Sequence, residues 1–202
     1  DNVGDVAGMG ADLYESYVGS ILSTCALGVV AFNKIPSVNA LTAVALPLIM
    51  AAVGVICSII GSFLVKTKEN ASQKNLLSAL SRGTNFAAIA TAIISFFAVW
   101  WLLGIDNYGI YIAILVGLAA GVAIGKVTEY YTSDTYKPTQ NLSASSETGT
   151  ATLIISGLSL GMLSTLLPIL IVGVAVIVAY FCAQLGIEGT DSTLGLYGIS
   201  IA

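Results

Sequence analysis

The sequence predicts an all-α protein, a polytopic membrane helical bundle that forms a single domain over residues 1–202. Composition is the first reason: 56% of the residues are hydrophobic, 9% are charged, and the mean hydropathy is +0.93. These values lie beyond those of a water-soluble globular domain. The second reason is that the apolar residues gather in long segments near the length of about 20 residues that a membrane-spanning helix needs.

Five long helices and the beginning of a sixth are expected. They cover residues 1–33, 40–66, 84–104, 108–132 and 148–185, with a truncated helix at 194–202. The fifth contains Pro168, where we expect a kink or a tilt. The polar stretch from Tyr130 to Thr150 contains Pro138 and is interpreted as a loop whose end caps the fifth helix.

Charge and residue usage exclude several classes of function. The net charge is −4 and no basic cluster stands in the sequence, which argues against nucleic acid as a partner. The chain has no histidine, the commonest general base and a usual zinc ligand. Cys25, Cys57 and Cys182 each lie in apolar sequence without a CxxC spacing, so they are interpreted as buried free thiols.

The most informative stretch is the beginning of the chain, which places four acids on one helical face. Asp1, Asp5, Asp12 and Glu15 fall within an arc of about 80°, spread over about 21 Å of helix. Val18–Phe32 contains no charge, so Asp12 and Glu15 enter an apolar helix. Acids in such helices usually line an ion pathway, which makes a solvated acidic face the weaker interpretation. The outer carboxylates suit magnesium bound together with substrate phosphates.

The distribution of lysine and arginine predicts the orientation. Helix parity places the loops at 66–82 and 126–147 on one side, together with Lys66, Lys68, Lys74, Arg82, Lys126 and Lys137. The other side holds Lys34 beside Asp106, Glu188 and Asp191. The positive-inside rule makes the first side cytoplasmic, and residues 1–5 then lie at the cytoplasmic side.

Several motifs resemble those of the membrane-bound, ion-translocating inorganic pyrophosphatases. They are DNVGD at 1–5, AGMGADL at 7–13 with an acid one turn later, TEYYTS at 128–133, the 136–138 segment, TGTAT before ISGLSLGM, and GLYGISIA at 195–202. The resemblance covers essentially the whole chain. It implies an internal fragment of a sixteen-helix, two-ring pump that hydrolyses pyrophosphate and moves ions across the membrane.

The resemblance also implies roles for the acids. Asp1 and Asp5 would hold Mg2+ on pyrophosphate, and Asp5 would orient and deprotonate the attacking water. Asp12 would belong to the ion gate, and Glu15 to the transported-ion site with Ser16 as a neutral oxygen ligand. An acid at Glu15 resembles the prokaryotic sodium-pumping branch, in which K+ would be an activator and the plasma membrane the location. This favours Na+, and H+ stays open as the pumped ion.

Further implications concern the assembly and its alternatives. The resemblance implies a homodimer in the lipid bilayer, with part of the contact made by the fifth segment, and an inactive isolated fragment. Leu153 and Leu163 depart from the family pattern, so altered packing or coupling is expected there. The main alternative is a secondary cation or proton transporter without hydrolysis, in which Asp12 and Glu15 alternately bind H+ and Na+. That alternative leaves the outer acids unexplained, and a purely structural bundle explains the acid stripe least well.

Overall fold

The chain folds as a group of long helices. The computed structural model describes residues 2–33, 40–67, 72–104, 107–185 and 192–202. Its helices are α1 (Asn2–Phe32), α2 (Ala40–Leu64), α3 (Gln73–Leu103), α4 (Tyr108–Thr132), α5 (Lys137–Ser145), the 3-10 turn η2 (Ser146–Thr148), α6 (Thr150–Ala183) and α7 (Ser192–Ile201). Within these described ranges, five helices are long and apolar enough to cross a membrane. The all-α membrane fold is therefore confirmed.

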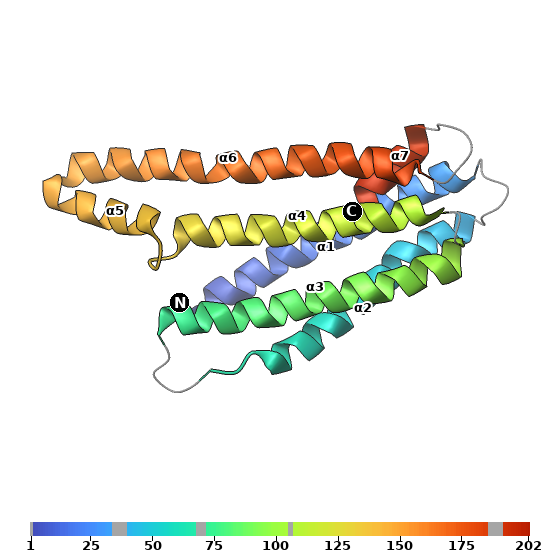
Figure 1. Ribbon diagram of the computed structural model, residues 1–202, viewed down its shortest axis with the longest axis horizontal. Coiled ribbons are helices and arrows are strands. Elements are labelled where there is room, and N and C mark those ends of the chain that lie inside the picture. The colour runs from blue at the N-terminus through green and yellow to red at the C-terminus, as the bar shows by residue number, and fades with distance from the viewer. Residues whose placement is uncertain (1, 34–39, 68–71, 105–106, 186–191) are drawn as a thin grey trace.

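The long helices run alongside one another in two antiparallel pairs. Figure 1 shows α2 beside α3 and α4 beside α6, with α1 behind them and α7 turning back into the bundle. In Figure 1 the start of α1, the end of α2, the start of α3 and the α4–α6 connection lie toward the same end of the bundle. Because consecutive long helices alternate in direction, every second connection lies at this end, as expected from the sequence.

The buried core lies where α1, α2, α3, α4 and α7 meet. Its residues are Ala31, Phe32, Ala43, Leu46, Val99, Leu103, Ile110, Ile114, Leu194 and Tyr197. The rings of Phe32 and Tyr197 pack edge to face with their centroids 5.3 Å apart, a preferred geometry for aromatic pairs. This core holds the second half of α1 and leaves its first half outside.

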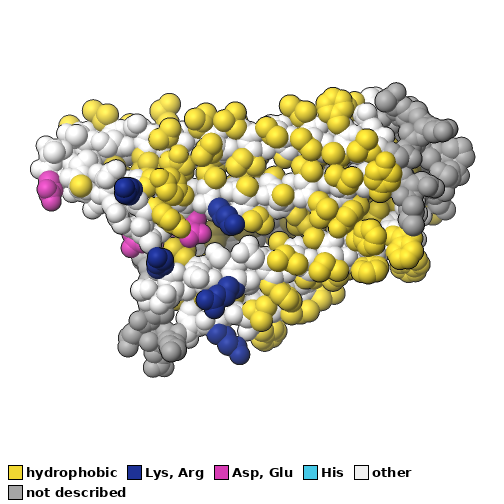
Figure 2. Space-filling model, in the orientation of Figure 1, with side chains coloured by type: hydrophobic (Ala, Val, Ile, Leu, Met, Phe, Trp, Pro, Cys, Tyr) yellow, Lys and Arg dark blue, Asp and Glu magenta, His cyan; other side chains and the backbone are white. Residues whose placement is uncertain are grey.

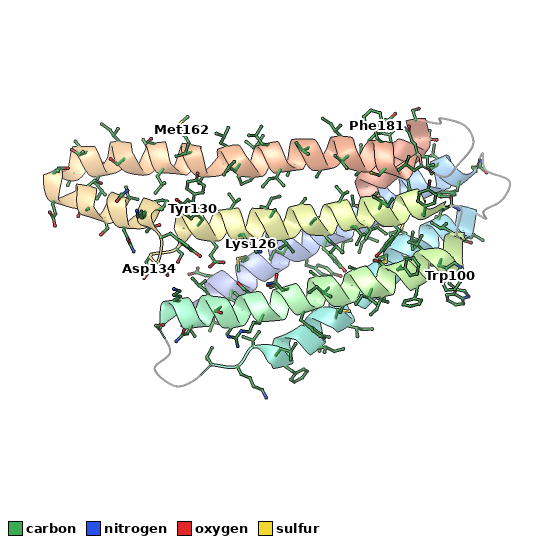
Figure 3. All side chains as sticks on the ribbon, viewed as in Figure 1. Trp100, Lys126, Tyr130, Asp134, Met162 and Phe181 are labelled. Atoms are coloured by element: carbon green, nitrogen blue, oxygen red, sulfur yellow. The ribbon has the colours of Figure 1, made fainter. Side chains whose placement is uncertain are left out.

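The face of the molecule seen in Figure 2 is apolar over most of its length and charged toward one end. Figure 2 shows hydrophobic side chains along the bundle and the basic side chains gathered toward the α5 side. We call this the basic end; its described cations are Lys66, Lys74, Arg82, Lys126 and Lys137. In Figure 3, Tyr130 lies toward the basic end, and Trp100 and Phe181 lie toward the opposite end. Aromatic side chains at both levels are typical of the two membrane interfaces.

Two expectations about helix boundaries are wrong. The third helix begins at Gln73 and not at residue 84, because Leu76, Leu77 and Leu80 recur at helical spacing among polar residues that a search for continuous apolar sequence excludes. The interpreted loop contains α5, and Pro138 stands in its first turn, where the missing N–H has no helical partner to lose. Proline here begins a helix.

The structure also shows the surroundings of Pro168 and of the three cysteines. Pro168 lies inside α6, which continues on both sides of it. All three cysteines are free thiols; Cys57 is buried, whereas Cys25 and Cys182 are half-buried. The expectation of full burial is therefore right for Cys57 alone.

Candidate functional site

The acid-bearing helix, α1, packs with one face and exposes the other. Its buried and half-buried residues are Val18, Ile21, Thr24, Cys25, Leu27, Gly28, Ala31 and Phe32. At about 100° per residue, this packed face is centred roughly opposite the stripe of Asp5, Asp12 and Glu15. These three acids are exposed, and so is the whole segment from Val3 to Tyr17. The acids therefore point away from the helices that hold α1.

Two hydroxyl contacts attach α1 to its neighbours. The hydroxyl of Tyr17 donates to the carbonyl oxygen of Ala51 in α2 at 3.0 Å. The Oγ1 of Thr24 lies 2.8 Å from the carbonyl oxygen of Ser20 and 2.7 Å from that of Ser200 in α7. Hydroxyl bonds to backbone carbonyls are a usual means of joining membrane helices. They fix α1 on the side opposite its acids.

The structure places the predicted site residues on one open surface. Asp1 lies outside the described residues. Asp5 and Asp12 are seven residues apart, about 10 Å along the helix, and Glu15 follows Asp12 by about one turn. Ser16 is exposed on the same side, and its carbonyl oxygen accepts a hydrogen bond from Ser20 Oγ at 2.9 Å.

No closed metal site exists within the part of the chain that the structure describes, because no three acidic, cysteine or histidine side chains come together there. Magnesium does not require such a cage. It is commonly held by one or two carboxylates, with waters and substrate phosphates as the other ligands. An exposed carboxylate such as that of Asp5 fits this donor set, with the remaining ligands coming from elsewhere.

The main cavities lie away from the acids. One of about 740 Å³ runs between α3 and α4 and is lined by residues that include Asn85, Lys126 and Glu129. A smaller one of about 280 Å³ lies on the packed side of α1 and carries the hydroxyl groups of Tyr17, Thr24 and Ser200. The acid stripe is thus an open helix face, and these described helices do not enclose it.

Sequence reasoning missed the residues that orient α1. They are Tyr17, Thr24 and Gly28 on α1 itself, Ala43 on α2 and Tyr197 on α7. A signal was available, because hydroxyl groups in apolar helices need backbone acceptors and a glycine permits close helix contact. The motif GLYGISIA pointed to Tyr197 without giving it a role.

Comparison with known proteins gives the same family for the whole chain. Residues 1–202 match the family model described as inorganic H+ pyrophosphatase. A Bacteroides thetaiotaomicron protein named "Putative K(+)-stimulated pyrophosphate-energized sodium pump" is 52% identical over 208 residues, covering 100% of this chain and 28% of that protein. The K(+)-insensitive pyrophosphate-energized proton pump of Methanosarcina mazei is 38% identical over 206 residues, covering 100% of this chain and 29% of its own.

The name of a third relative includes both stimulation by potassium and the pumping of sodium. The K(+)-stimulated pyrophosphate-energized sodium pump of Thermotoga maritima is 35% identical over 214 residues, covering 96% of this chain and 28% of its own length. The chain thus spans about 28% of the length of the curated relatives it matches. The family match over residues 1–202 and the five described helices that are long and apolar enough to cross a membrane lead to one conclusion: this multi-pass integral membrane chain belongs to the membrane-bound pyrophosphatases, the family of pyrophosphate-energized Na+ or H+ pumps.

Proposed function

We propose that the full-length protein hydrolyses pyrophosphate with Mg2+ and couples the reaction to the pumping of Na+ across the membrane, with H+ as the alternative ion. The observation that carries the proposal is the exposed acid stripe of Asp5, Asp12 and Glu15 on a membrane helix that the other described helices contact on its opposite face. Exposed carboxylates in an apolar helix are costly unless cations or further helices meet them. A pump that binds a metal, a phosphate and an ion along one helix provides such partners.

In this proposal the outer acids serve hydrolysis. Asp1 and Asp5 hold Mg2+, which supplies neutralisation of the phosphate charge when it is bound. The Asp5 carboxylate orients a water molecule and accepts its proton as the water oxygen attacks phosphorus and the second phosphate leaves. An exposed carboxylate at the start of α1 is available for this role.

The inner acids serve ion transport. Asp12 belongs to the gate, and Glu15 and Ser16 supply a carboxylate and a hydroxyl oxygen to the transported ion. Hard oxygen donors of this kind bind a small cation without its full hydration shell. The names of the Bacteroides and Thermotoga relatives support Na+ and K+ stimulation, whereas the Methanosarcina relative's name supports H+.

The charge distribution supports the orientation. The basic end carries Lys66, Lys74, Arg82, Lys126 and Lys137, and α1 starts toward the same end. By the positive-inside rule the basic end is cytoplasmic, and the bacterial relatives support a prokaryotic plasma membrane. Cytosolic pyrophosphate would then reach residues 1–5 before the deeper acids.

The exposed apolar face of α6 supports a homodimer. Ile155, Leu158, Met162, Leu166 and Ile169 are all largely exposed along this helix. In a bilayer such a face meets either lipid or another apolar helix. We assign part of it to the contact with a second copy.

The test uses the full-length protein in sealed vesicles. Magnesium-dependent phosphate release from pyrophosphate is measured with and without Na+, together with Na+ uptake and acidification of the lumen. Release stimulated by Na+ with Na+ uptake supports the sodium pump. Release without Na+ stimulation, accompanied by acidification, replaces Na+ by H+. Cation exchange without any phosphate release would mean a secondary transporter and would overturn the proposal.

A further inference from the structure

A proline in α2 leaves a backbone carbonyl without its helical donor. Pro47 lies inside α2 and has no N–H, so the carbonyl oxygen of Ala43, one turn earlier, loses its usual hydrogen bond. In a membrane-embedded bundle water cannot replace that bond, and another protein group must do so. The hydroxyl of Tyr197 in α7 donates to this oxygen at 3.0 Å. Ala43 and Tyr197 are both fully buried.

The same ring also contacts α1. A Cβ placed on Gly28 would lie 3.1 Å from the carbonyl oxygen of Ala43 and 3.1 Å from Cε2 of Tyr197, closer than ordinary van der Waals contact. Glycine therefore opens the notch into which the ring fits. The edge-to-face contact with Phe32 lies one turn further along α1. Three helices thus meet at one tyrosine.

This contact constrains the rotation of α1 about its axis. The notch at Gly28 has to face Tyr197, and the Thr24 hydroxyl reaches Ser200 on the same side. Any rotation that moves Gly28 away from the ring turns Asp12 and Glu15 through the same angle, because a helix rotates as one body. One residue of register corresponds to about 100°, which is more than the width of the acid stripe.

We propose that Tyr197 is a positioning residue for ion binding: its hydroxyl satisfies the carbonyl that Pro47 frees, and its ring fixes the rotation of α1 that aims Asp12 and Glu15. The constraint on α1 follows from the contacts above, and its effect on ion binding rests on the proposed function. Tyr197 acts through α1: its side chain contacts Ala43 and Phe32. The described acids Asp5, Asp12 and Glu15 lie on the opposite face of that helix.

The experiment is a double-mutant cycle on the full-length protein. Tyr197→Phe removes the hydroxyl and keeps the ring, whereas Pro47→Ala restores the N–H that the Ala43 carbonyl lacks. Two properties are measured for each variant: thermal unfolding in detergent, and the Na+ concentration for half-maximal pyrophosphate hydrolysis in vesicles. Pro168→Ala in α6 is the matched control, since it restores a helical donor away from Tyr197.

Tyr197→Phe should raise the half-saturating Na+ concentration about fivefold, the change expected from one hydrogen bond, while the KM for pyrophosphate stays within about twofold. In the Pro47→Ala background the same substitution should change the Na+ requirement by less than about twofold, because the carbonyl already has a donor. In the Pro168→Ala background the full effect should remain. Gly28→Ala should also raise the Na+ requirement, whereas Gly54→Ala, with open space around its Cβ, should not.

The outcomes separate this inference from the proposed function. If Tyr197→Phe changes the Na+ requirement and the thermal unfolding equally with and without Pro47, the hydroxyl does not compensate for the missing proline N–H. That result would overturn the inference even in an active pump. Lower thermal stability with an unchanged Na+ requirement would make Tyr197 merely structural and overturn its positioning role. A wild-type protein that hydrolyses no pyrophosphate would remove the proposed function and this role with it, although coupling in thermal unfolding would still establish the bond. If Pro47→Ala does not fold, an unchanged Na+ requirement in Gly28→Ala would overturn the positioning role.

Discussion

The hydroxyl of Tyr17 lies 3.0 Å from the carbonyl oxygen of Ala51 and joins the acid-bearing half of α1 to α2. Ala51 lies within α2, so its carbonyl also faces the N–H of Val55 in the helical ladder. The tyrosine therefore adds a bond to an oxygen that already has a partner. This differs from Tyr197, whose acceptor has lost its helical donor.

Tyr17→Phe should consequently cost less stability than Tyr197→Phe. We expect about 0.5 kcal/mol for Tyr17→Phe, because a single hydrogen bond is worth about 1 kcal/mol and this acceptor stays paired. Tyr197→Phe should cost about 1–3 kcal/mol, since it leaves a buried carbonyl unsatisfied. Thermal unfolding of the two variants of the full-length protein gives the comparison. Equal losses would contradict the difference between the two acceptors.

Asp5→Asn should abolish pyrophosphate hydrolysis. The amide is nearly isosteric but cannot accept the proton of the attacking water, and general base catalysis contributes about 10²–10⁴-fold. Phosphate release by the full-length variant is the measurement. Gly125→Ala in α4, where an added Cβ meets open space, should keep turnover close to that of the wild type. A fully active Asp5→Asn protein would remove Asp5 from the role of base.

Glu15→Gln should uncouple sodium from hydrolysis. Loss of the carboxylate removes the charge that compensates a bound cation in the membrane, so stimulation by Na+ and uptake of 22Na+ into vesicles should both fall by at least about tenfold. The control is Ser23→Ala, which changes an exposed hydroxyl two turns further along the same side of α1. Unchanged Na+ uptake in Glu15→Gln would place the ion site elsewhere.

Gly109→Ala should disrupt the packing of α4 on α6. A Cβ at this position would overlap the carbonyl oxygens of Cys182 and Leu185, and backbone atoms cannot move aside as a flexible side chain can. Overpacking of this kind costs about 1–3 kcal/mol. Gly121→Ala, in the same helix but with nothing near its Cβ, should unfold at or above the wild-type temperature, because alanine favours the helix. Unfolding followed by circular dichroism in detergent distinguishes the two.

Much of this structure could be predicted because its strongest signals are long and apolar. The membrane spans follow from hydrophobic length, and the position of Asp5, Asp12 and Glu15 on one face of α1 follows from the 3.6-residue period. The early start of α3 was missed because Lys74 and Arg82 break the apolar run while its leucines keep the helical period. The helix α5 was missed because Pro138 is compatible with both a loop and a first helical turn.

The contacts of Tyr197 with Ala43 and Gly28 could not be predicted, since they join residues far apart in the sequence. The sequence around Pro47 does not identify the hydrogen-bond donor for the Ala43 carbonyl. The sequence around Gly28 does not identify the ring that packs against it. Such pairings depend on how helices cross, which hydrophobic periodicity does not determine. The roles of Asp1, Asp5, Asp12, Glu15 and Ser16 stay predictions, because the described helices pack on the face of α1 opposite the acid stripe.

The bond between Tyr197 and Ala43 spans 154 residues, and this separation has a consequence for biosynthesis. A growing chain delivers α1 and α2 to the bilayer long before α7 emerges from the ribosome. During that interval the Ala43 carbonyl lacks the Tyr197 donor that it has in the folded chain. The junction of α1, α2 and α7 at Tyr197 can therefore be completed only after α7 has been synthesised.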